Sequence, residues 1–333
     1  MRITKTSNFD KFICIADKCP CSCCKGWQIV IDDEKLSEYI RLSDADKQSN
    51  LGAIAPRLYN GIDWDEGCFK QFDGRCAMLG DDEFCDLQRE AGEGMLCTTC
   101  RQYPRHMEEF KDVREWSLSL SCPEAARIIL SNTDRLEFIV SNTSDSDDEE
   151  DYEDFDYELY ESLLEARSEM FDIIQDRNMR FADKARALIS FISEEDEDSD
   201  DDSLENECDI DYTDKRLFSK LFELETLNPS WADIVDTTWN NWEDELRLSP
   251  EEEIQAEQLL MFWIYTYFCG AVYDDWVLSK VMLAVCSTYW IFQIHHACKL
   301  EGGLIQAAYS YAREIEHSDI NLDDLEEWFE SQE

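Results

Sequence analysis

The chain has 333 residues and 44% of them are hydrophobic, which is enough for one large domain or two ordinary ones with packed cores. Its formal net charge is −47: the first 132 residues hold 17 basic and 23 acidic side chains, and the remainder holds 13 and 54. Such a field repels nucleic acid and anionic membranes and would suit a lysine-bearing substrate, although charge alone favours a merely solvated surface.

The sequence predicts neither a secretory signal nor a membrane-spanning helix. The first residues, Met-Arg-Ile-Thr-Lys-Thr-Ser-Asn, contain no apolar stretch of a secretory signal, so we expect a cytoplasmic protein with reduced cysteines. The two longest apolar runs, 259–273 and 277–294, are short or interrupted by Lys280 and Gln293, which predicts buried helices and no membrane insertion.

The first 132 residues predict a loop-rich module with a few short elements. In chain order these are a strand at 27–31, a helix from Asp32 or Asp33 to about Leu42, a hairpin within 68–87 that turns at Asp73-Gly74, and helical segments at 86–100 and 123–140, the last with Pro123 as its first residue and Cys122 as its cap.

The remaining residues, 133–333, predict an acidic helical domain. Two acidic, Ser-rich stretches, 141–158 and 194–207, are typical of flexible loops. Apolar residues recur at helical spacing over 159–192, and 254–273 and 276–300 predict a buried helical hairpin that turns at Asp274-Asp275. The fold class is therefore mainly α, with the module of residues 1–132 packed on the helical domain.

Cysteine is unusually frequent in the module. Eleven of the 15 cysteines lie in 14–122, and the odd total in a reducing compartment suits a disulfide framework poorly, so the clustering indicates a metal centre rather than plain packing. Four cysteines lie later in the chain and are interpreted as core or surface thiols: Cys208, Cys269, Cys286 and Cys298.

The ligands of this centre are expected among nine cysteines. The spacing Cys97-x2-Cys100 is a hook that supplies two thiolates from one turn, and Cys122 at a helix N-terminus should have a lowered pKa. Nine scattered thiols exceed one tetrahedral zinc, which favours a [4Fe–4S] cluster, with zinc as the alternative. The candidates, of which a subset would bind the metal, are Cys14, Cys19, Cys23, Cys24, Cys76, Cys85, Cys97, Cys100 and Cys122.

An ordered pattern surrounds these cysteines. It runs through Phe12-Ile13-Cys14, Cys19, Cys23-Cys24-Lys25-Gly26-Trp27, Ile31-Asp32, Gly74-Arg75-Cys76, Phe84-Cys85-Asp86, Leu96-Cys97-x2-Cys100-Arg101-x-Tyr103-Pro104-Arg105 and Ser117 to Ala125. Over about residues 10–130 it resembles the flagellin lysine-N-methylase family, with weaker similarity at 265–284. Part of it is also similar to a smaller family of zinc- or iron-chelating domains named for a CxxCxxCC pattern.

The resemblance implies methylation of lysine side chains on flagellin with S-adenosylmethionine as methyl donor. Arg101 and Arg105 are candidates to hold the cofactor's carboxylate, or else they pair with acidic residues and brace the metal loop. Tyr103, Asp274 and Asp275 are the catalytic candidates, whereas the aspartates can equally form a solvated turn. The alternative function is a non-catalytic metal-binding or redox-sensing protein.

Overall fold

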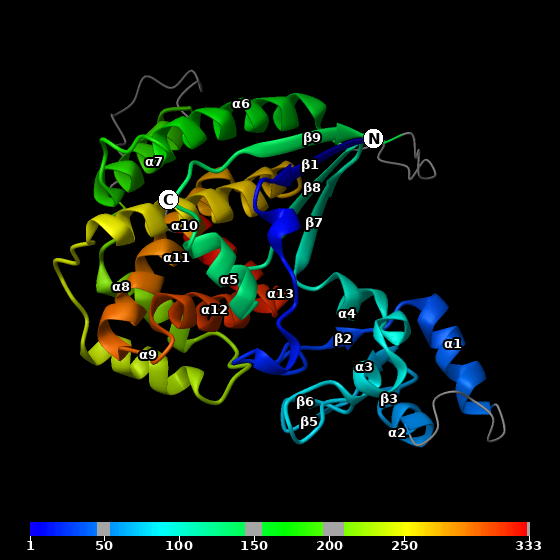
Figure 1. The fold of residues 1–333 in the computed structure, drawn as a ribbon. Coiled ribbons are helices and arrows are strands. Elements are labelled where there is room, and N and C mark those ends of the chain that lie inside the picture. Colours follow the sequence, from blue (N-terminus) through cyan, green and yellow to red (C-terminus); the bar gives the residue numbers. More distant parts are fainter. Residues whose placement is uncertain (45–53, 144–154, 196–209, 332–333) are drawn as a thin grey trace.

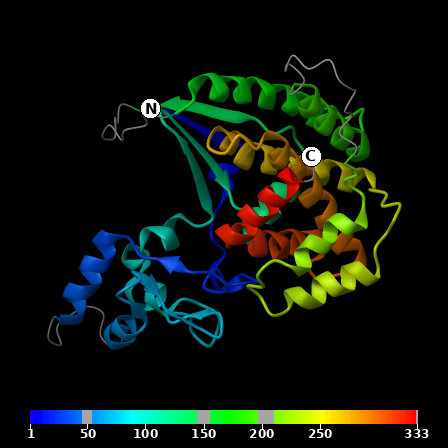
Figure 2. The ribbon, with the colours of Figure 1, turned by 180° about the vertical axis from the view of Figure 1, so that it is seen from behind.

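The computed structural model describes residues 1–44, 54–143, 155–195 and 210–331, and these form two lobes (Figure 1). The first, here called the cysteine lobe, comprises residues 23–103. The second, the helical body, contains the chain's remaining described elements together with its larger hydrophobic core. Both views place the cysteine lobe at the end of the molecule opposite to the helices of residues 157–195 (Figures 1 and 2).

A four-stranded sheet forms one side of the helical body. Its strands are β1 (Arg2–Thr6), β7 (Arg105–Phe110), β8 (Val113–Leu118) and β9 (Phe138–Asn142), in the spatial order β7-β8-β1-β9. β1 is parallel to β8 and antiparallel to β9. A parallel pair needs a long crossover connection. The whole cysteine lobe lies within the connection between β1 and β8, so the pairing of these two strands brings together the chain segments that enter and leave the lobe.

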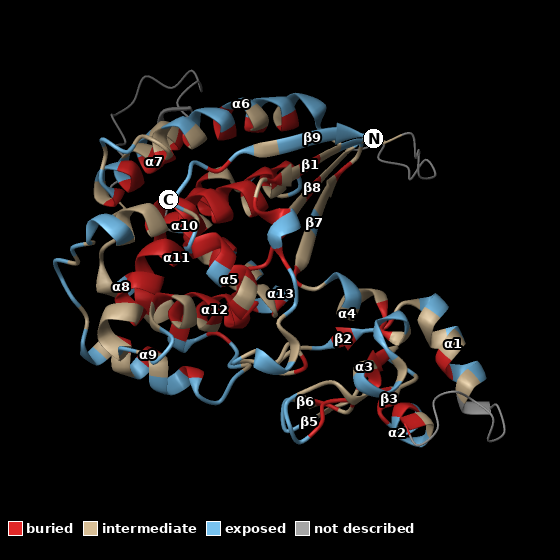
Figure 3. Ribbon diagram, in the orientation of Figure 1, coloured by how far each residue is buried: buried red, intermediate tan, exposed pale blue. Residues whose placement is uncertain are grey.

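The described helical segments of the body include one long central helix, α11, around which several of the others pack. α11 is in contact with α7, α9, α10, α12 and α13, and buried residues are concentrated in α10 and α11 (Figure 3). The segments are α5 (Pro123–Leu130), α6 (Tyr157–Ile174), α7 (Phe181–Glu195), α8 (Lys215–Phe218), η5 (Ser219–Phe222), α9 (Trp231–Asn240), α10 (Pro250–Tyr267), η6 (Phe268–Val272), α11 (Val277–Cys298), α12 (Gly303–Glu316) and α13 (Asp319–Glu330), with the short η1 (Phe9–Lys11) at the start.

The cysteine lobe has short elements around its own small core, whose residues come from the segment 24–97 of the sequence. Two small sheets, β2-β4-β3 and β5-β6, are antiparallel. The elements are β2 (Ile29–Val30), α1 (Asp33–Asp44), α2 (Ile54–Asn60), β3 (Ile62–Asp63), β4 (Cys68–Phe69), β5 (Gln71–Phe72), β6 (Arg75–Cys76), α3 (Asp86–Ala91), η3 (Glu93–Met95) and α4 (Thr98–Gln102), with η2 (Ala16–Lys18) in the preceding loop.

The mainly α class is confirmed, as are most of the predicted helices. The helix after Asp32, the helices within 159–192 and the hairpin of α10 and α11 are present, and Pro123 opens α5 behind Cys122. The predicted helix at 123–140 is wrong in its second half: α5 ends at Leu130, and 138–142 form β9. Phe138 of this strand stacks on Phe171 and Tyr265, contacts that local sequence cannot anticipate.

The predicted acidic loops fall largely on 144–154 and 196–209, outside the described residues. The division of the chain at residue 132 stays a prediction. Among the described helices α11 alone is long and apolar enough to cross a membrane by length and composition, and its side chains are buried inside the body.

Candidate metal centre and adjoining cavity

Six cysteines of the lobe lie close together, and we call them the thiol cluster: Cys23, Cys24, Cys76, Cys85, Cys97 and Cys100. Short backbone pairings bring them together from separate segments. The N–H of Cys76 donates to the carbonyl of Cys24 at 2.8 Å, and Leu79 forms an isolated bridge with Cys85. Asp73 and Gly74, both with positive φ, make the tight turn that returns β6 to this place.

Hydrogen bonds favour the thiolate at Cys23, Cys85 and Cys97, whereas hydrogen bonds to those neighbours raise the pKa of Cys24 and Cys100 and burial raises that of Cys76. Cys85 precedes α3 and Cys97 precedes α4, each as the N-cap residue. A hydrogen bond from Cys24, assisted by the N–H groups of Gln88 and Leu87 and opposed by burial, lowers the pKa of Cys85 to about 7. A hydrogen bond with Cys100 likewise lowers the pKa of Cys97. Anionic sulfur is the form that binds a metal.

Arg313 of α12 reaches the thiol cluster from the helical body. Its Nη2 donates to the carbonyls of Ser22 and Lys25 at 3.0 and 2.7 Å, which fixes the loop that carries Cys23 and Cys24. After the Cys24 hydrogen bond, the Arg313 charge is a further cause that lowers the pKa of Cys23, against burial. Its Nη1 is buried and has no hydrogen-bond partner in the described parts of the chain. A buried cation with an unused donor beside Cys23 fits an anionic metal–thiolate centre.

The other candidate ligands lie around the thiol cluster rather than in it. Cys14 is exposed, and Cys19 interacts with Cys14, Cys21 and Cys23. Cys122 is buried and interacts with Cys19 and Cys23, but burial outweighs the helix N-terminus and raises its pKa to about 12, so the expected lowering was wrong. Cys68 stands apart, in contact with Gln28.

The three later cysteines that the structure describes belong to the helical body, as expected. Cys269 and Cys286 are buried and Cys298 is half-buried. Cys208 lies outside the described residues.

A cavity of about 450 Å³ lies where the cysteine lobe meets the helical body. Trp27, Tyr103 and Arg105 line it from the first third of the chain, and Tyr267, Lys280, Glu316 and His317 line it from the helices. The volume falls within the range of small-ligand pockets, about 300–1,000 Å³. The cavity adjoins the thiol cluster, because the Trp27 indole donates to the carbonyl of Cys23 at 2.7 Å.

One buried carboxylate organises the cavity wall. Glu316 accepts hydrogen bonds from the Tyr267 hydroxyl at 3.0 Å, the Ser119 hydroxyl at 3.2 Å and the Ser121 N–H at 2.9 Å. Burial raises the pKa of Glu316 to about 7, against these hydrogen bonds and the charge of His106. A carboxyl group with this pKa can both take up and release a proton near neutrality.

The Ser121 hydroxyl extends this network to the cysteine lobe. It lies 3.1 Å from the Tyr103 hydroxyl and 2.9 Å from Nε2 of His317. Burial, with the nearby Arg313 charge, lowers the pKa of His317 to about 3, so its imidazole is neutral. The wall therefore offers neutral hydrogen-bonding groups next to the aromatic faces of Trp27 and Tyr103.

Lys280 is the buried cation of the cavity. Its Nζ donates to Asp274 at 2.7 Å and forms an ion pair with Glu326. Asp274 thus acts on the cavity through Lys280, while Asp275, with a φ of 64°, is exposed at the turn.

The sequence candidates divide accordingly. Tyr103 and Arg105 line the cavity, whereas Arg101 is exposed and bonds Thr98 of its own helix. Three tyrosines of the α10–α11 region differ in their surroundings: Tyr265 is buried, Tyr267 lines the cavity, and Tyr273 is exposed.

Sequence reasoning missed Glu316, His317 and Arg313. The available signal was the four ionisable residues Arg313, Glu314, Glu316 and His317 close together at the end of a helix.

Comparison with known proteins shows what class this architecture belongs to. Residues 214–333 match the model of the FliB lysine N-methylase C-terminal domain. The matched residues include those that line the cavity from the helices. The chain is 30% identical over 138 residues to the flagellar biosynthetic protein FliU of Salmonella muenchen, covering 40% of this chain and 80% of that protein.

Two further relatives carry the name lysine-N-methylase, from Salmonella typhimurium (strain LT2) and Salmonella choleraesuis (strain SC-B67). Each is 30% identical over 139 residues, which covers 40% of this chain and 34% of the relative, so the match spans about a third of those proteins. No solved structure matches. The class is that of the protein-lysine methyltransferases. Within it, the chain belongs to the FliB lysine N-methylase family, which confirms the resemblance noted in the sequence.

Proposed function

We propose that this protein transfers methyl groups from S-adenosylmethionine to the ε-amino groups of lysines on flagellin, in the cytoplasm. The observation that carries the proposal is the cavity of about 450 Å³, which the cysteine lobe and the family-matching helices build together. The strongly acidic second part of the chain supports a cationic, lysine-bearing partner.

Residues of the cavity supply what amine methylation requires. S-adenosylmethionine, when bound, supplies an electrophilic methyl group on a sulfonium. A lysine ammonium must first lose a proton, and Glu316, with its pKa raised to about 7, can accept it. The new N–C bond then forms as the S–C bond breaks, and Glu316 passes the proton to solvent after turnover.

Recognition falls to neighbouring side chains. The aromatic faces of Trp27, Tyr103 and Tyr267 line the cavity, exclude water and attract cationic sulfonium or methylammonium groups. Arg105, whose guanidinium also lies over the Phe12 ring at 5.2 Å, can pair with the carboxylate of the methyl donor.

The thiol cluster would hold a [4Fe–4S] cluster, with zinc as the alternative. Its role is structural: it fixes the loop before Trp27 and the helix before Tyr103, and so sets one wall of the cavity. Among the described residues no three cysteine sulfurs lie within 4.8 Å of one another. The six thiols nevertheless exceed the four that one tetrahedral zinc binds, which favours the larger cluster.

The test is methyl transfer in vitro. Protein purified without oxygen is mixed with flagellin and S-adenosylmethionine carrying a labelled methyl group, and modified lysines are located by mass spectrometry. We expect label on flagellin lysines with the wild-type protein and strongly reduced label with Glu316→Gln. Absence of label on every lysine, with a protein that retains its metal, would refute the activity.

A second function, redox sensing without catalysis, is favoured by one observation: a thiol with a pKa of about 7, Cys85, within a cluster of six. Calorimetry separates the two proposals, because a sensor predicts no binding of S-adenosylmethionine. The enzyme predicts binding that Trp27→Ala weakens.

A further inference from the structure

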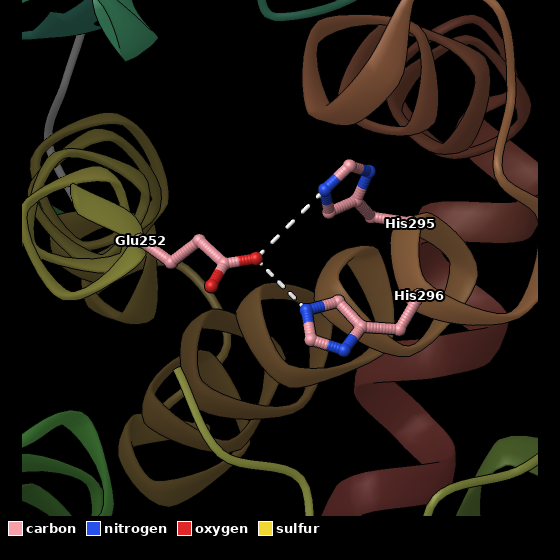
Figure 4. Close-up of side chains that lie close together, drawn as sticks. All are labelled: Glu252, His295 and His296. Atoms are coloured by element: carbon pink, nitrogen blue, oxygen red, sulfur yellow. Dashed lines mark hydrogen bonds and ion pairs between the residues drawn. The ribbon is translucent and has the colours of Figure 1, made fainter. Parts of the chain in front are cut away.

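A second group of potential metal ligands lies far from the thiol cluster. Glu252 in the first turn of α10 faces His295 and His296 in the last turn of α11 (Figure 4). One ligand atom of each residue lies within 4.8 Å of the other two, and within the described parts of the chain this is the one such group of three or more His, Cys, Asp or Glu.

The group is remote from the cavity. Tyr267 and Lys280, which line the cavity, lie at the opposite ends of the same two helices. Fifteen residues separate Glu252 from Tyr267 and also Lys280 from His295, and at 1.5 Å per residue this is about 22 Å along each helix. Whatever binds here is therefore not part of the proposed methyl-transfer site.

The carboxylate is held in a fixed orientation. Glu252 belongs to a capping box, in which its Oε2 accepts from the N–H of Ser249 at 2.8 Å. The other oxygen, Oε1, points to the two imidazoles: it lies 2.8 Å from Nε2 of His296 and 3.8 Å from Nε2 of His295. The helix cap thus leaves one oxygen free for both histidines.

His295 lacks the hydrogen bonds that a simple polar contact would give it. Its Nε2 is too far from Glu252 for a hydrogen bond, and its Nδ1 is buried with no partner among the described residues. An ion between the three side chains would give Nε2 of His295 a partner and would bind Nε2 of His296 and Oε1 of Glu252 in place of their mutual contact. Metal–nitrogen bonds of about 2.0–2.1 Å would require only small movements of these atoms.

His296 has the second contact that metal-binding histidines usually have. Its Nδ1 lies 3.3 Å from a carboxylate oxygen of Glu243. The Glu243 backbone is itself held by Gln293, which donates to its carbonyl at 2.8 Å and accepts from its N–H at 3.1 Å. A carboxylate behind an imidazole fixes the ring and increases its basicity as a ligand.

We propose that Glu252, His295 and His296 form a second metal site that takes a first-row transition-metal dication such as Zn²⁺. Two imidazoles and one carboxylate select such ions over Ca²⁺ and Mg²⁺, which prefer oxygen ligands. Three protein ligands leave a coordination position for water. The ion ties the start of α10 to the end of α11 and so braces the helical pair that forms the far wall of the cavity.

The test uses the full-length protein with its thiol centre loaded under anaerobic conditions, so that added Zn²⁺ meets occupied cysteines. Side-chain nitrogen NMR follows the histidines, of which the chain has four. We expect one equivalent of Zn²⁺ to shift the resonances of His295 and His296 and to leave those of His106 and His317, in the cavity, unchanged.

Variants define the ligands. The double variant His295→Gln/His296→Gln should lose the added equivalent in calorimetry, and Glu252→Gln should weaken Zn²⁺ binding at least tenfold. Glu243→Gln should weaken it about tenfold, as for an outer carboxylate. Glu251→Gln, which makes the same charge change on an exposed neighbour, should bind as the wild type does.

Two results would overturn the site. One is the absence of any shift of His295 and His296 at one equivalent of Zn²⁺ in a folded protein. The other is binding that persists unchanged in the double histidine variant, which would place the ion on thiols. Circular dichroism of each variant checks its fold. The melting temperature is an independent readout: Zn²⁺ should raise it in the wild type and leave it unchanged in the double histidine variant.

Discussion

The indole of Trp27 stacks on the imidazole of His317, with ring centroids 4.8 Å apart and planes inclined by 23°. Tyr103 lies against both rings, at 5.5 and 5.8 Å. The three residues come from the loop after the double cysteine, the end of the Cys-x2-Cys helix and the end of α12. This trio therefore joins the metal-binding lobe to the helices that match the methylase family.

Replacing Trp27 with alanine should uncouple the two lobes. Aromatic pairs contribute about 0.5–1.5 kcal/mol beyond their buried area, and the variant also loses the indole hydrogen bond to Cys23. We expect lower stability in urea, an intact metal content and at least tenfold weaker methyl-donor binding. Trp27→Phe, which keeps a ring, is the control, and equal binding by wild type and Trp27→Ala would contradict a role for the trio.

Glu316 should make both stability and rate depend on pH. Its pKa is about 7 when folded against 4.5 when exposed, so the folded state binds more protons between these values and the wild type loses stability as pH rises from about 4.5 to 7. A shift of this size corresponds to about 3 kcal/mol. Glu316→Gln should remove this loss, which denaturant unfolding at pH 5 and pH 8 measures.

The same carboxylate should set the pH profile of methyl transfer. The rate is expected to rise with pH through about 7, and Glu316→Gln should lower it about 100-fold or more and flatten the profile. Glu314→Gln is a matched control: burial also raises the pKa of Glu314 to about 7, but this residue caps the loop at Leu227 and Asn228 and does not line the cavity. A normal profile for Glu316→Gln would exclude Glu316 as the base.

Arg313→Met should loosen the metal centre. The change removes both hydrogen bonds to the carbonyls of Ser22 and Lys25 and the charge beside Cys23. We expect a lower metal content and faster bleaching of the absorption near 400 nm in air. Arg127→Met, which removes an exposed arginine paired with Glu124, should retain the wild-type metal content. Unchanged metal retention in Arg313→Met would show that the guanidinium does not support the centre.

Cys24→Ser and Cys68→Ser distinguish the thiol cluster from cysteines of the same lobe. Both thiols are buried, but only Cys24 is hydrogen-bonded to two other cysteines. Metal analysis should find depleted metal in Cys24→Ser and full occupancy in Cys68→Ser. Equal occupancy in the two variants would place the centre elsewhere.

Local signals predicted much of the secondary structure. The turn at Asp73-Gly74, the Pro123 start of α5 and the apolar periodicity of α10 and α11 depend on nearest neighbours, and the structure has all three. Local signals did not predict the strand at 138–142, because its pairing with β1 joins residues more than 130 positions apart. Likewise Lys280 was visible only as a charge in an apolar run, and its partner Glu326 was not predictable.

By itself the sequence determined the chemistry available: clustered thiols, a mainly helical second part, an acidic field and membership of a methylase family. Only the tertiary structure decided which side chains meet. Glu316 and His317 are ordinary residues at a helix end until contacts with Ser121 and Tyr103 place them in the cavity wall. Burial and long-range contacts set the pKa of Glu316 and form the cavity, and neither can be derived from neighbouring residues in the sequence.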